Sequence, residues 1–552
     1  MTPSRDTWDV VVIGSGGAGL RAAIAAAEAG ARVLVVTKGT LQHSGATASA
    51  NFSYCATFGY FGVDDSVDAY AEDIVASGLG IADPSLAHRL AADAGLEAAR
   101  LETYGVGWRR REDGRHQLAT FGGHRFPRAI HVGLRTGKVV MASLARAVAA
   151  CGIATWEHAV AVDLLADPRG VAGILVYDIP TGTTVAIAAG AVVIATGGCV
   201  AMFDLHTNPD ELVGDGLALA YEAGADLVDM EFIQHYPTVF LAPAAARGLH
   251  YPTGRLLGFG GRLLNARGEE FFARHQGGSI EAATRDQVAR AIALEVRAGG
   301  GTAGGGVYVD ARAMPPERVR DLHFEAYFHD IGVFVDREPQ EVTAAAHYLL
   351  GGIRIDADGR TSVSGLFAAG EVAGGVHGAN RLTGSALPEV IVFGAAAGHA
   401  AAAAAHARDE RSPTASRWAA WCDALRASDG APGVDVATET RRLRDALARG
   451  AGTLKTEEGL AAALETIAAV EQRLPMLRVR SAARRWNWEI VQCLELRAML
   501  VAARLHCLAA RERTESRGAH QRLDHPGTDD ARWRRRILLR RTAERTAMEI
   551  AA

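Results

Sequence analysis

The first forty residues have the hydrophobic pattern of a strand, a helix and a second strand. An apolar run at residues 10–13 predicts a buried strand, and an alanine-rich stretch that stops at Gly30 predicts a helix. A second apolar run, within residues 32–37, predicts the next strand. The turn between the first strand and the helix is rich in glycine: Gly14, Gly16, Gly17 and Gly19.

The same α/β pattern continues over much of the chain. Residues 39–52 are small and polar and predict a loop, and residues 190–199 form a buried strand that ends in paired glycines. The helix expected after Gly214 runs to Ala223. Further helices are predicted within residues 66–106 and 136–149, and further strands within residues 153–176.

The α/β pattern is interrupted once and then gives way to helices. From about residue 231 to residue 341 turns are frequent, and the pattern resumes at residues 365–370. We therefore predict an α/β fold: a discontinuous Rossmann-like nucleotide-binding domain, an inserted α+β capping domain and a C-terminal helical domain. The predicted bounds are 1–230, 231–345, 346–410 and 411–552, with a linker at residues 411–414 and helices at 437–449, 456–474 and 483–511.

Composition limits the class of protein. A chain of 552 residues with 49% apolar residues and a net charge of −5 fits a soluble multidomain protein that does not bind nucleic acid. The one basic run, residues 532–541, predicts a solvated helix face or a partner-docking patch. The first strand begins within ten residues of Met1 and no run of eighteen apolar residues occurs, so we expect a cytoplasmic protein with no membrane span.

Cysteine spacing argues against a metal centre in this chain. The six cysteines are scattered, and none stands in the C-x-x-C spacing of zinc or iron–sulfur sites. Scattered thiols are typical of a reducing compartment. We expect no metal in this chain.

The glycine-rich turn predicts dinucleotide binding. Glycines let the backbone approach a pyrophosphate, and the helix N-terminus supplies N–H donors and a partial positive charge. A strand before the turn and a strand after the helix make the pattern specific. Asp215 is either an acceptor for a ligand hydroxyl or the N-cap of the helix that begins there.

Several segments together resemble the succinate dehydrogenase/fumarate reductase flavoprotein family, which also includes L-aspartate oxidase. The matching segments, in chain order, are V-V-I-G-S-G-G-A-G-L at 11–20, A-T-G-G at 195–198, G-D-G at 214–216, D-M-E-x-x-Q at 229–234, R-D-x-V-A-R at 285–290, H-Y-x-x-G-G-I at 347–353, F-A-A-G-E-V-A at 367–373, G-A-N-R-L at 378–382, E-S-R-G-A-H at 515–520 and D-D-x-x-W at 529–533. The resemblance implies FAD, a capping domain, hydride exchange at the flavin N5 and a small carboxylic acid substrate.

The resemblance also implies which residues carry the chemistry. Arg285 is the implied proton donor or acceptor, an unusual role for a side chain that is almost always protonated, and His347 and Arg381 would hold a carboxylate. The plainer alternatives are a helix-terminal ion pair for Arg285, a core histidine for His347 and a loop-stabilising role for Arg381. The implied FAD contacts are Gly14, Ser15, Gly16, Gly17, Ala18, Gly19, Thr37, Lys38, Ser44, Gly45, Ala46, Thr47, Thr196, Gly197, Asp215, Glu371, Ala386 and Leu387.

The sequence departs from the family in the substrate-binding segments. The family's H-P-T becomes Tyr236-Pro237-Thr238, with His235 one place too early to take over the histidine's role. Tyr236 can still donate a hydrogen bond to the substrate, and His235 stays a substrate-site candidate. In the family's T-E-G segment Thr253 is kept, but Gly254 replaces the acid.

Two further departures concern the flavin. The family's G-N-S-L becomes Gly384-Ser385-Ala386-Leu387, which loses the serine hydroxyl. Where many members attach FAD through a histidine in S-H-T, this chain has Ser44-Gly45, so we expect FAD to bind non-covalently. His43 is the alternative tether.

Three functions fit these observations. The first is an FAD-dependent oxidoreductase of the fumarate reductase/succinate dehydrogenase type, which interconverts a carbon–carbon single and double bond in a carboxylic acid. The second is L-aspartate oxidase-like amino acid desaturation, although no acidic residue is evident for the substrate amine. The third is an electron-transfer flavoprotein subunit that docks to a separate iron–sulfur protein.

Overall fold

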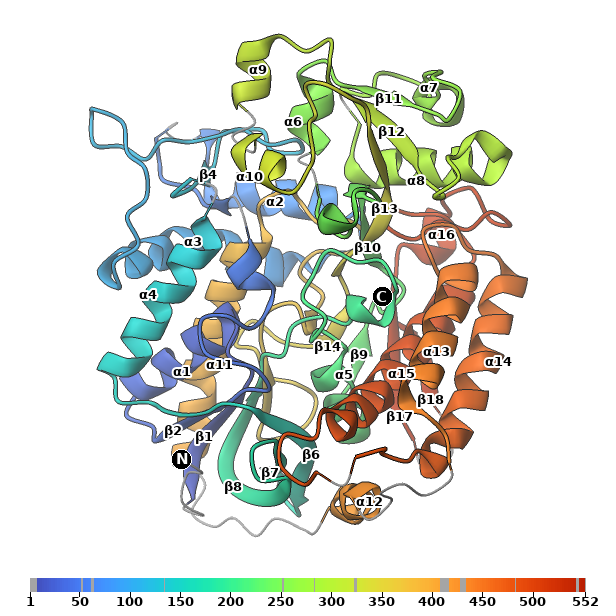
Figure 1. The fold of residues 1–552 in the computed structure, drawn as a ribbon. Helices are drawn as coiled ribbons and strands as arrows, with labels where there is room; N and C mark the ends of the chain where they lie inside the picture. Colours follow the sequence, from blue (N-terminus) through green and yellow to red (C-terminus); the bar gives the residue numbers. More distant parts are fainter. Residues whose placement is uncertain are drawn as a thin grey trace.

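A computed structural model describes residues 7–551 except 51–52, 61–63, 134, 251–252, 282, 322–324, 408–415, 427–432, 482 and 543–545. Figure 1 shows a large α/β body, a cap above it and a layer of helices along one side. This confirms the predicted fold class. The linker predicted at residues 411–414 lies outside the described residues.

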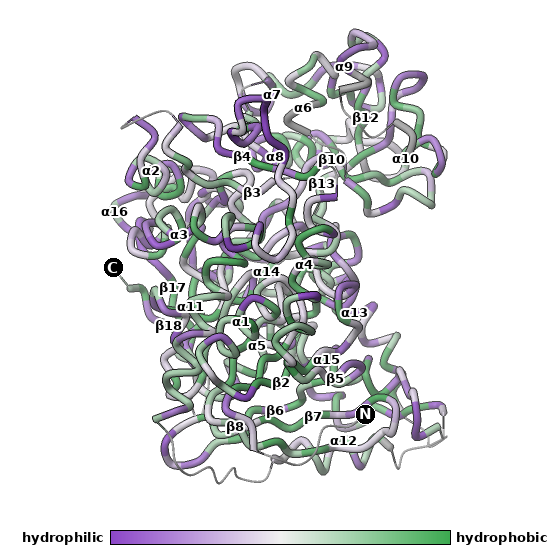
Figure 2. Tube along the Cα trace, turned by 90° about the vertical axis from the view of Figure 1, so that its left-hand side faces the viewer, coloured by the Kyte–Doolittle hydropathy of each residue, from purple (hydrophilic) through white to green (hydrophobic). Residues whose placement is uncertain are grey.

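The body is built on a seven-stranded sheet. Its order is β5-β2-β1-β8-β7-β6, and β15 also pairs with β8. The strands nearest the glycine turn are parallel and buried on both faces, which explains their continuous apolar runs. Figure 2 shows the hydrophobic colour over β6, β7 and β8. The strand bounds are β1 Trp8–Ile13, β2 Val33–Val36, β5 Ala154–Trp156, β6 Ala159–Asp167, β7 Gly170–Asp178, β8 Thr183–Ile194 and β15 Leu366–Ala368.

Helices and a small strand pair surround this sheet. The predicted helical stretch at 66–106 is two helices, because the chain turns at Gly78–Gly80, where Gly80 has a φ of +80°. The loop predicted at 39–52 contains one short 3₁₀ turn, η1 Ala46–Ser49. The other bounds are α1 Gly17–Glu28, β3 Tyr54–Cys55, α2 Val67–Ser77, α3 Pro84–Thr103, β4 Ala129–Ile130, α4 Thr136–Ala150, η3 Val200–Met202, α5 Asp215–Glu222 and α11 Ala386–His406.

Helix α11 is a core element of the body. Among the described helices it is long and apolar enough to cross a membrane, but 78% of its most apolar window is buried inside the protein. It packs along α1 and against β8. Its hydropathy is therefore that of a buried helix in an α/β fold.

The cap is an antiparallel sheet with its own apolar core. The sheet order is β10-β13-β12-β11, and helix α8 packs on β10 and β13. Strand β13 runs to Leu349, past the predicted boundary at 345, so His347 belongs to a cap strand. The bounds are β10 Ile233–Phe240, η4 Ala244–Ala246, α6 Thr253–Gly258, β11 Arg262–Leu264, α7 Phe272–Gln276, α8 Arg285–Glu295, η5 Val296–Gly300, β12 Val307–Asp310, α9 Pro316–Asp321, α10 Glu325–Asp330 and β13 Gln340–Leu349.

The C-terminal part is helical, as predicted, but ends in a β-hairpin that the sequence pattern did not reveal. The hairpin joins the five-stranded sheet β16-β14-β9-β17-β18. Its bounds and those of the preceding helices are α12 Arg417–Arg426, α13 Val436–Gly450, α14 Glu457–Arg473, η6 Leu474–Met476, α15 Trp488–Glu512, α16 Asp530–Trp533, β17 Arg536–Arg541 and β18 Thr546–Ala551; the partner strands are β9 Leu227–Val228, β14 Gly352–Arg354 and β16 Ala373–Gly374.

The prediction of a helix face for the basic run at 532–541 is therefore wrong. Most of the run is strand β17, and its arginines hold the hairpin on the body. Arg540 makes a two-point ion pair with the buried Asp226, and Arg536 bonds Asp83 at 3.1 Å. Between these two arginines lie three consecutive buried apolar residues, Ile537, Leu538 and Leu539, which form the core of the strand.

Candidate functional site

One cavity of about 970 Å³ runs from the glycine turn to the underside of the cap. The body contributes strand ends and loops, and the cap contributes β10, β13 and the start of α8. Most residues of the two groups predicted from sequence, for the cofactor and for the substrate, line this same cavity.

The glycine turn forms the floor of the cavity. Gly14 has a φ of +106°, and the N-cap of α1 is Gly16, which offers no capping side chain. A Cβ at Gly16 would meet no protein atom within 4 Å, so it would project into the open cavity. Thr47 accepts the Gly17 N–H, but no described hydrogen bond engages the N–H group of Ala18, which is left for a ligand such as a pyrophosphate.

Gly19 has a packing role and does not line the cavity. A Cβ there would lie 1.9 Å from the backbone oxygen of Gly14. The residue therefore keeps α1 close to the end of β1. The prediction that Gly19 contacts the cofactor is corrected, whereas Gly14, Ser15, Gly16, Gly17 and Ala18 all line the cavity.

The end of β2 is held by polar contacts. The Ser15 hydroxyl donates to Thr37 at 2.8 Å, and the Lys38 ammonium lies 2.9 Å from Asp215 and 2.7 Å from Glu495. The two carboxylates offset the burial of Lys38 and raise its pKa. Gly214 is the N-cap of α5, so the capping role considered for Asp215 is wrong. The Asp215 carboxylate instead pairs with Lys38, and Asp215 lines the cavity.

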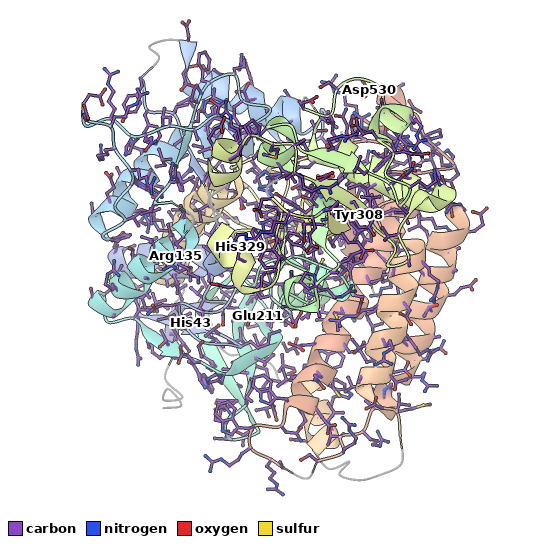
Figure 3. All side chains as sticks on the ribbon, turned by 45° about the horizontal axis from the view of Figure 1, so that its top comes forward. His43, Arg135, Glu211, Tyr308, His329 and Asp530 are labelled. Atoms are coloured by element: carbon purple, nitrogen blue, oxygen red, sulfur yellow. The ribbon has the colours of Figure 1, made fainter. Side chains whose placement is uncertain are left out.

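The loop after β2 closes over the glycine turn. Thr47 accepts the N–H of Gly17 at 3.2 Å, and Glu211 accepts the N–H of Gly45. Ser44, Gly45, Ala46 and Thr47 all line the cavity. His43 is exposed and is not among the lining residues (Figure 3).

The far side of the cofactor region comes from later segments. Thr196, Gly197, Glu371, Ala386 and Leu387 line it, and their contacts with FAD stay a prediction. Burial raises the pKa of the Glu371 carboxyl to about 7, and the carboxylate accepts the Leu349 N–H at 3.0 Å. The Ser385 hydroxyl instead lies 3.1 Å from that of Tyr70 in the core.

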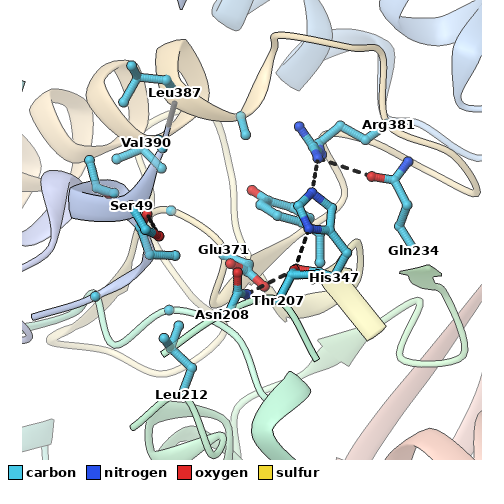
Figure 4. Close-up of a pocket in the computed structure, with 18 of the residues that line it drawn as sticks. Ser49, Thr207, Asn208, Leu212, Gln234, His347, Glu371, Arg381, Leu387 and Val390 are labelled. Atoms are coloured by element: carbon cyan, nitrogen blue, oxygen red, sulfur yellow. Dashed lines mark hydrogen bonds between the residues drawn. The ribbon is translucent and has the colours of Figure 1, made fainter. Parts of the chain in front are cut away.

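A connected polar group forms the wall beside the cap strands (Figure 4). Arg381 lies 3.0 Å from the Gln234 oxygen and 3.4 Å from Nε2 of His347, and Nδ1 of His347 lies 2.7 Å from the Thr207 hydroxyl. Because a guanidinium only donates, Nε2 accepts and the Nδ1 proton points to Thr207. Burial and the neighbouring cation Arg381 hold the pKa of His347 well below its usual range, so the ring is neutral.

Arg381 is a buried cation in this wall. Its Cζ lies 4.3 Å from the centre of the Tyr348 ring, and burial lowers its pKa to about 10. Among the hydrogen bonds that the structure describes, it has no carboxylate partner. A guanidinium that is desolvated and not neutralised favours an anionic ligand.

Arg285 approaches the cavity from the cap. It is the first residue of α8, which a Thr284–Gln287 capping box begins. Its Cζ lies 4.9 Å from the centre of the Tyr236 ring, and the ring of His250 packs against that tyrosine at 4.6 Å. Burial, followed by the charge of Arg285, lowers the pKa of His250 to about 4.

Two predicted substrate residues are not placed at the cavity. His235 points to the opposite face of β10 from Tyr236, toward the C-terminal helices, because side chains alternate along a strand. Burial lowers its pKa to about 3. Thr253 begins α6, and its side chain lies outside the described part of the chain.

The site includes residues that the sequence motifs did not single out. Thr207 and Asn208 orient His347, and Phe121 and His250 line the cavity. A signal for His250 was present: the tetrapeptide His-Tyr-Pro-Thr occurs at 235–238 and again at 250–253. Thr207 and Phe121 stand in loops without a distinctive pattern.

The cavity fits a flavin dinucleotide and a small anion. The floor supplies backbone donors and an open glycine position, and the wall supplies two guanidiniums and neutral hydrogen-bonding rings. Among the described residues no group of three or more His, Cys, Asp or Glu is arranged to hold a metal. The arrangement can orient a carboxylate at Arg381 and bring a proton-carrying cation, Arg285, beside it.

Sequence families match the two parts of the chain. Residues 9–387 match the FAD binding domain family, and residues 440–552 match the fumarate reductase flavoprotein C-terminal family. Together the two matched ranges cover most of the α/β body, the cap and the C-terminal helical part.

Individual proteins match along nearly their whole length. A fumarate reductase (CoM/CoB) subunit of Methanothermobacter marburgensis is 38% identical over 97% of both chains. L-aspartate oxidase of Mycobacterium bovis is 36% identical over 95% of this chain and 94% of its own. The structure of Mycobacterium smegmatis Sdh1 in complex with UQ1 superposes with a TM-score of 0.90 at 34% identity, over 99% of this chain and 94% of that one.

Proposed function

Because this chain belongs to the succinate dehydrogenase/fumarate reductase flavoprotein family, we propose that it interconverts fumarate and succinate or a closely similar pair of acids. The chain is an FAD-dependent oxidoreductase. The observation that carries the choice of substrate is the convergence of Arg285, His347 and Arg381 on the cavity that also contains the glycine turn.

The body and β13 hold the substrate. Arg381 attracts a carboxylate, and the neutral His347 accepts a hydrogen bond from Arg381 through Nε2 and so orients the guanidinium. Thr207 fixes the ring of His347, and Gln234 fixes the guanidinium. A carboxylate bound in this way is oriented before reaction, which lowers the entropic cost of the chemical step.

The proton is handled from the cap. Bound FAD would supply hydride exchange at its N5 atom, chemistry that no side chain can perform. Arg285 supplies or removes the second hydrogen as a proton, since its guanidinium enters the cavity from the cap and no hydrogen bond in the described structure engages it.

The contacts of the lining carboxylates favour an alkene substrate over an amino acid. An ammonium group would need a free carboxylate, and those that line the described cavity are Glu211, Asp215, Glu281 and Glu371. Asp215 is ion-paired with Lys38, and Glu211, Glu281 and Glu371 accept hydrogen bonds from Gly45, Ser279 and Leu349. In the described hydrogen bonds and ion pairs none of the four contacts Arg285, His347 or Arg381. The similarity to L-aspartate oxidases nevertheless makes amino acid oxidation the second candidate.

The proposal includes a non-covalent cofactor. Gly45 stands where related proteins would place an attaching histidine, and His43 is exposed outside the cavity. Acid precipitation of the purified yellow protein should leave the flavin in solution. Flavin in the protein pellet would contradict this part of the proposal.

The proposal also includes a separate electron-carrying partner. In the described structure the six cysteines form neither a disulfide nor a cluster site, so an iron–sulfur centre would belong to another chain. The related protein from Methanothermobacter is itself named as one subunit of an enzyme. Thiols outside disulfides also favour a cytoplasmic location.

Reoxidation of the reduced flavin tests the function. The holoenzyme is reduced with dithionite without oxygen and mixed with fumarate, with iminosuccinate generated from oxaloacetate and ammonia, or with oxygen. We expect fumarate to reoxidise the flavin fastest. Reoxidation by oxygen or by the imine but not by fumarate would instead support the amino acid oxidase.

A further inference from the structure

The tetrapeptide His-Tyr-Pro-Thr occurs twice, and only one histidine of the two copies reaches the cavity. In the first copy His235 faces the C-terminal helices, whereas Tyr236 faces the cavity. In the second copy His250 lines the cavity. Besides His347 on β13, a second imidazole from the cap therefore reaches the cavity, at position 250.

The backbone explains why the second copy lies against the first. After β10 the chain turns back, and the Leu249 oxygen accepts the N–H of Phe240 at 2.9 Å. His250 then forms a bridge with Val239. This pairing holds His250 beside β10, the strand that carries Tyr236.

The ring of His250 sits among the proposed substrate residues. It lies 4.6 Å from the Tyr236 ring and 5.8 Å from the His347 ring, measured between ring centres. Tyr236 in turn contacts Arg285, with 4.9 Å between Cζ and the ring centre. His250 and Arg285 therefore both pack against Tyr236, with His347 nearby.

The nitrogens of His250 are available to a ligand. In the part of the chain that the structure describes, His250 makes ring contacts, but no hydrogen bond engages its nitrogens. A neutral imidazole carries one N–H that can donate to a carboxylate oxygen. Its lowered pKa makes it a poor proton source for Arg285, since the protonated ring would stand beside that cation.

We propose that His250 donates a hydrogen bond to the second carboxylate of a dicarboxylic acid, the one that Arg381 does not hold. This inference rests on the proposed function, which it makes specific for dicarboxylates. The alternative donor at this place is the Tyr236 hydroxyl. Gly254 offers no side chain for the role.

Ligand binding to the oxidised holoenzyme tests the role of His250. Succinate has two carboxylates and butyrate has one, and both should perturb the visible flavin spectrum as they bind. In His250→Phe, which keeps a ring beside Tyr236, we expect the Kd of succinate to rise about tenfold to hundredfold, the range for a lost hydrogen bond to a charged group. The Kd of butyrate should change less than about twofold.

Two further variants separate this role from its alternatives. His250→Gln restores an N–H donor and should recover much of the succinate affinity. Tyr236→Phe keeps its ring and should change the succinate Kd less than His250→Phe does. The flavin spectrum and the melting temperature show whether each variant is folded.

The outcomes also separate this inference from the proposed function. If wild-type reduced enzyme is reoxidised by fumarate but His250→Phe binds succinate normally, or loses succinate and butyrate equally, the role of His250 is overturned and the function stands. A larger effect of Tyr236→Phe than of His250→Phe would assign the hydrogen bond to Tyr236. If the wild type neither binds succinate nor responds to fumarate, both proposals fail.

Discussion

The floor and the wall of the cavity recognise their ligands in different ways. The floor offers backbone N–H groups from one continuous segment, whose residues are mostly glycine. The wall offers guanidiniums and rings from β10, α8, β13 and the loop before α11. A floor of backbone depends on local conformation, whereas a wall of side chains depends on how distant segments pack.

The largest expected effect comes from breaking the wall at its proton carrier. Arg285→Lys should lower turnover by about 10²–10⁴, the contribution of a positioned acid or base, while FAD stays bound. Arg274→Lys is the matched control, because Arg274 lies on the cap outside the cavity. The measurement is steady-state turnover together with the flavin-to-protein ratio. Turnover within a few-fold of wild type would remove Arg285 from the mechanism.

Breaking the floor should affect the cofactor instead. Gly16→Val places a side chain in the open cavity without meeting protein atoms, so the chain should fold but bind FAD about 100-fold more weakly. Gly107→Val is the control, since its Cβ also meets nothing within 4 Å and Gly107 does not line the cavity. FAD titration of the apoproteins gives the two dissociation constants. Equal affinities would show that the pyrophosphate lies elsewhere.

A third change tests the buried support of the wall. Glu389 on α11 accepts the Tyr348 hydroxyl at 3.3 Å, and burial raises its pKa to about 8, above the ordinary value of 4.5. Because the folded state then binds the proton more tightly, the carboxyl's contribution to stability is present below pH 4.5 and lost as pH rises toward 8. Between pH 4.5 and pH 8 we expect the unfolding free energy of Glu389→Gln to rise by about 4 kcal/mol relative to that of the wild type.

Denaturant unfolding at pH 5, 6.5 and 8 measures this difference. Glu465→Gln, an exposed change on α14, serves as the control and should give a difference that is flat with pH. A flat difference for Glu389→Gln as well would mean that Glu389 is ionised in the folded protein.

The smallest effect is expected from a residue that acts through another. Thr207→Val removes the hydroxyl that orients His347, so we expect KM to rise about 3–10-fold, with little change in kcat. Thr466→Val, on the exposed side of α14, is the control. The split between KM and kcat is the useful readout. A fall in kcat alone would place Thr207 in the chemical step.

The floor could be predicted from the sequence because its signals are local. Gly14, Gly16 and Gly17 stand within four residues of one another, between an apolar strand and an alanine-rich helix. Gly19 was assigned to the cofactor from the same motif, but its backbone approach to Gly14 is visible only in three dimensions. The helix predicted for the basic run at β17 was wrong for a related reason. The number of arginines in a segment does not show whether the apolar residues between them are buried in a sheet.

The wall could be predicted only in part. Arg285, His347 and Arg381 were identified by resemblance to a family, since nothing in their local patterns points to one place. The partners Thr207 and His250 were missed, although the repeated tetrapeptide held a clue to the second. His235 and Tyr236 are neighbours in sequence, yet strand alternation sends them to opposite faces.

The sequence alone determined the nucleotide-binding unit, the inserted cap and the helical C-terminal part, because hydrophobic periodicity and glycine turns act over a few residues. Tertiary structure decided which imidazole meets the substrate and which polar atoms orient it. Side chains that are more than a hundred residues apart, such as Thr207 and His347, meet only when a loop of the body packs against a strand of the cap.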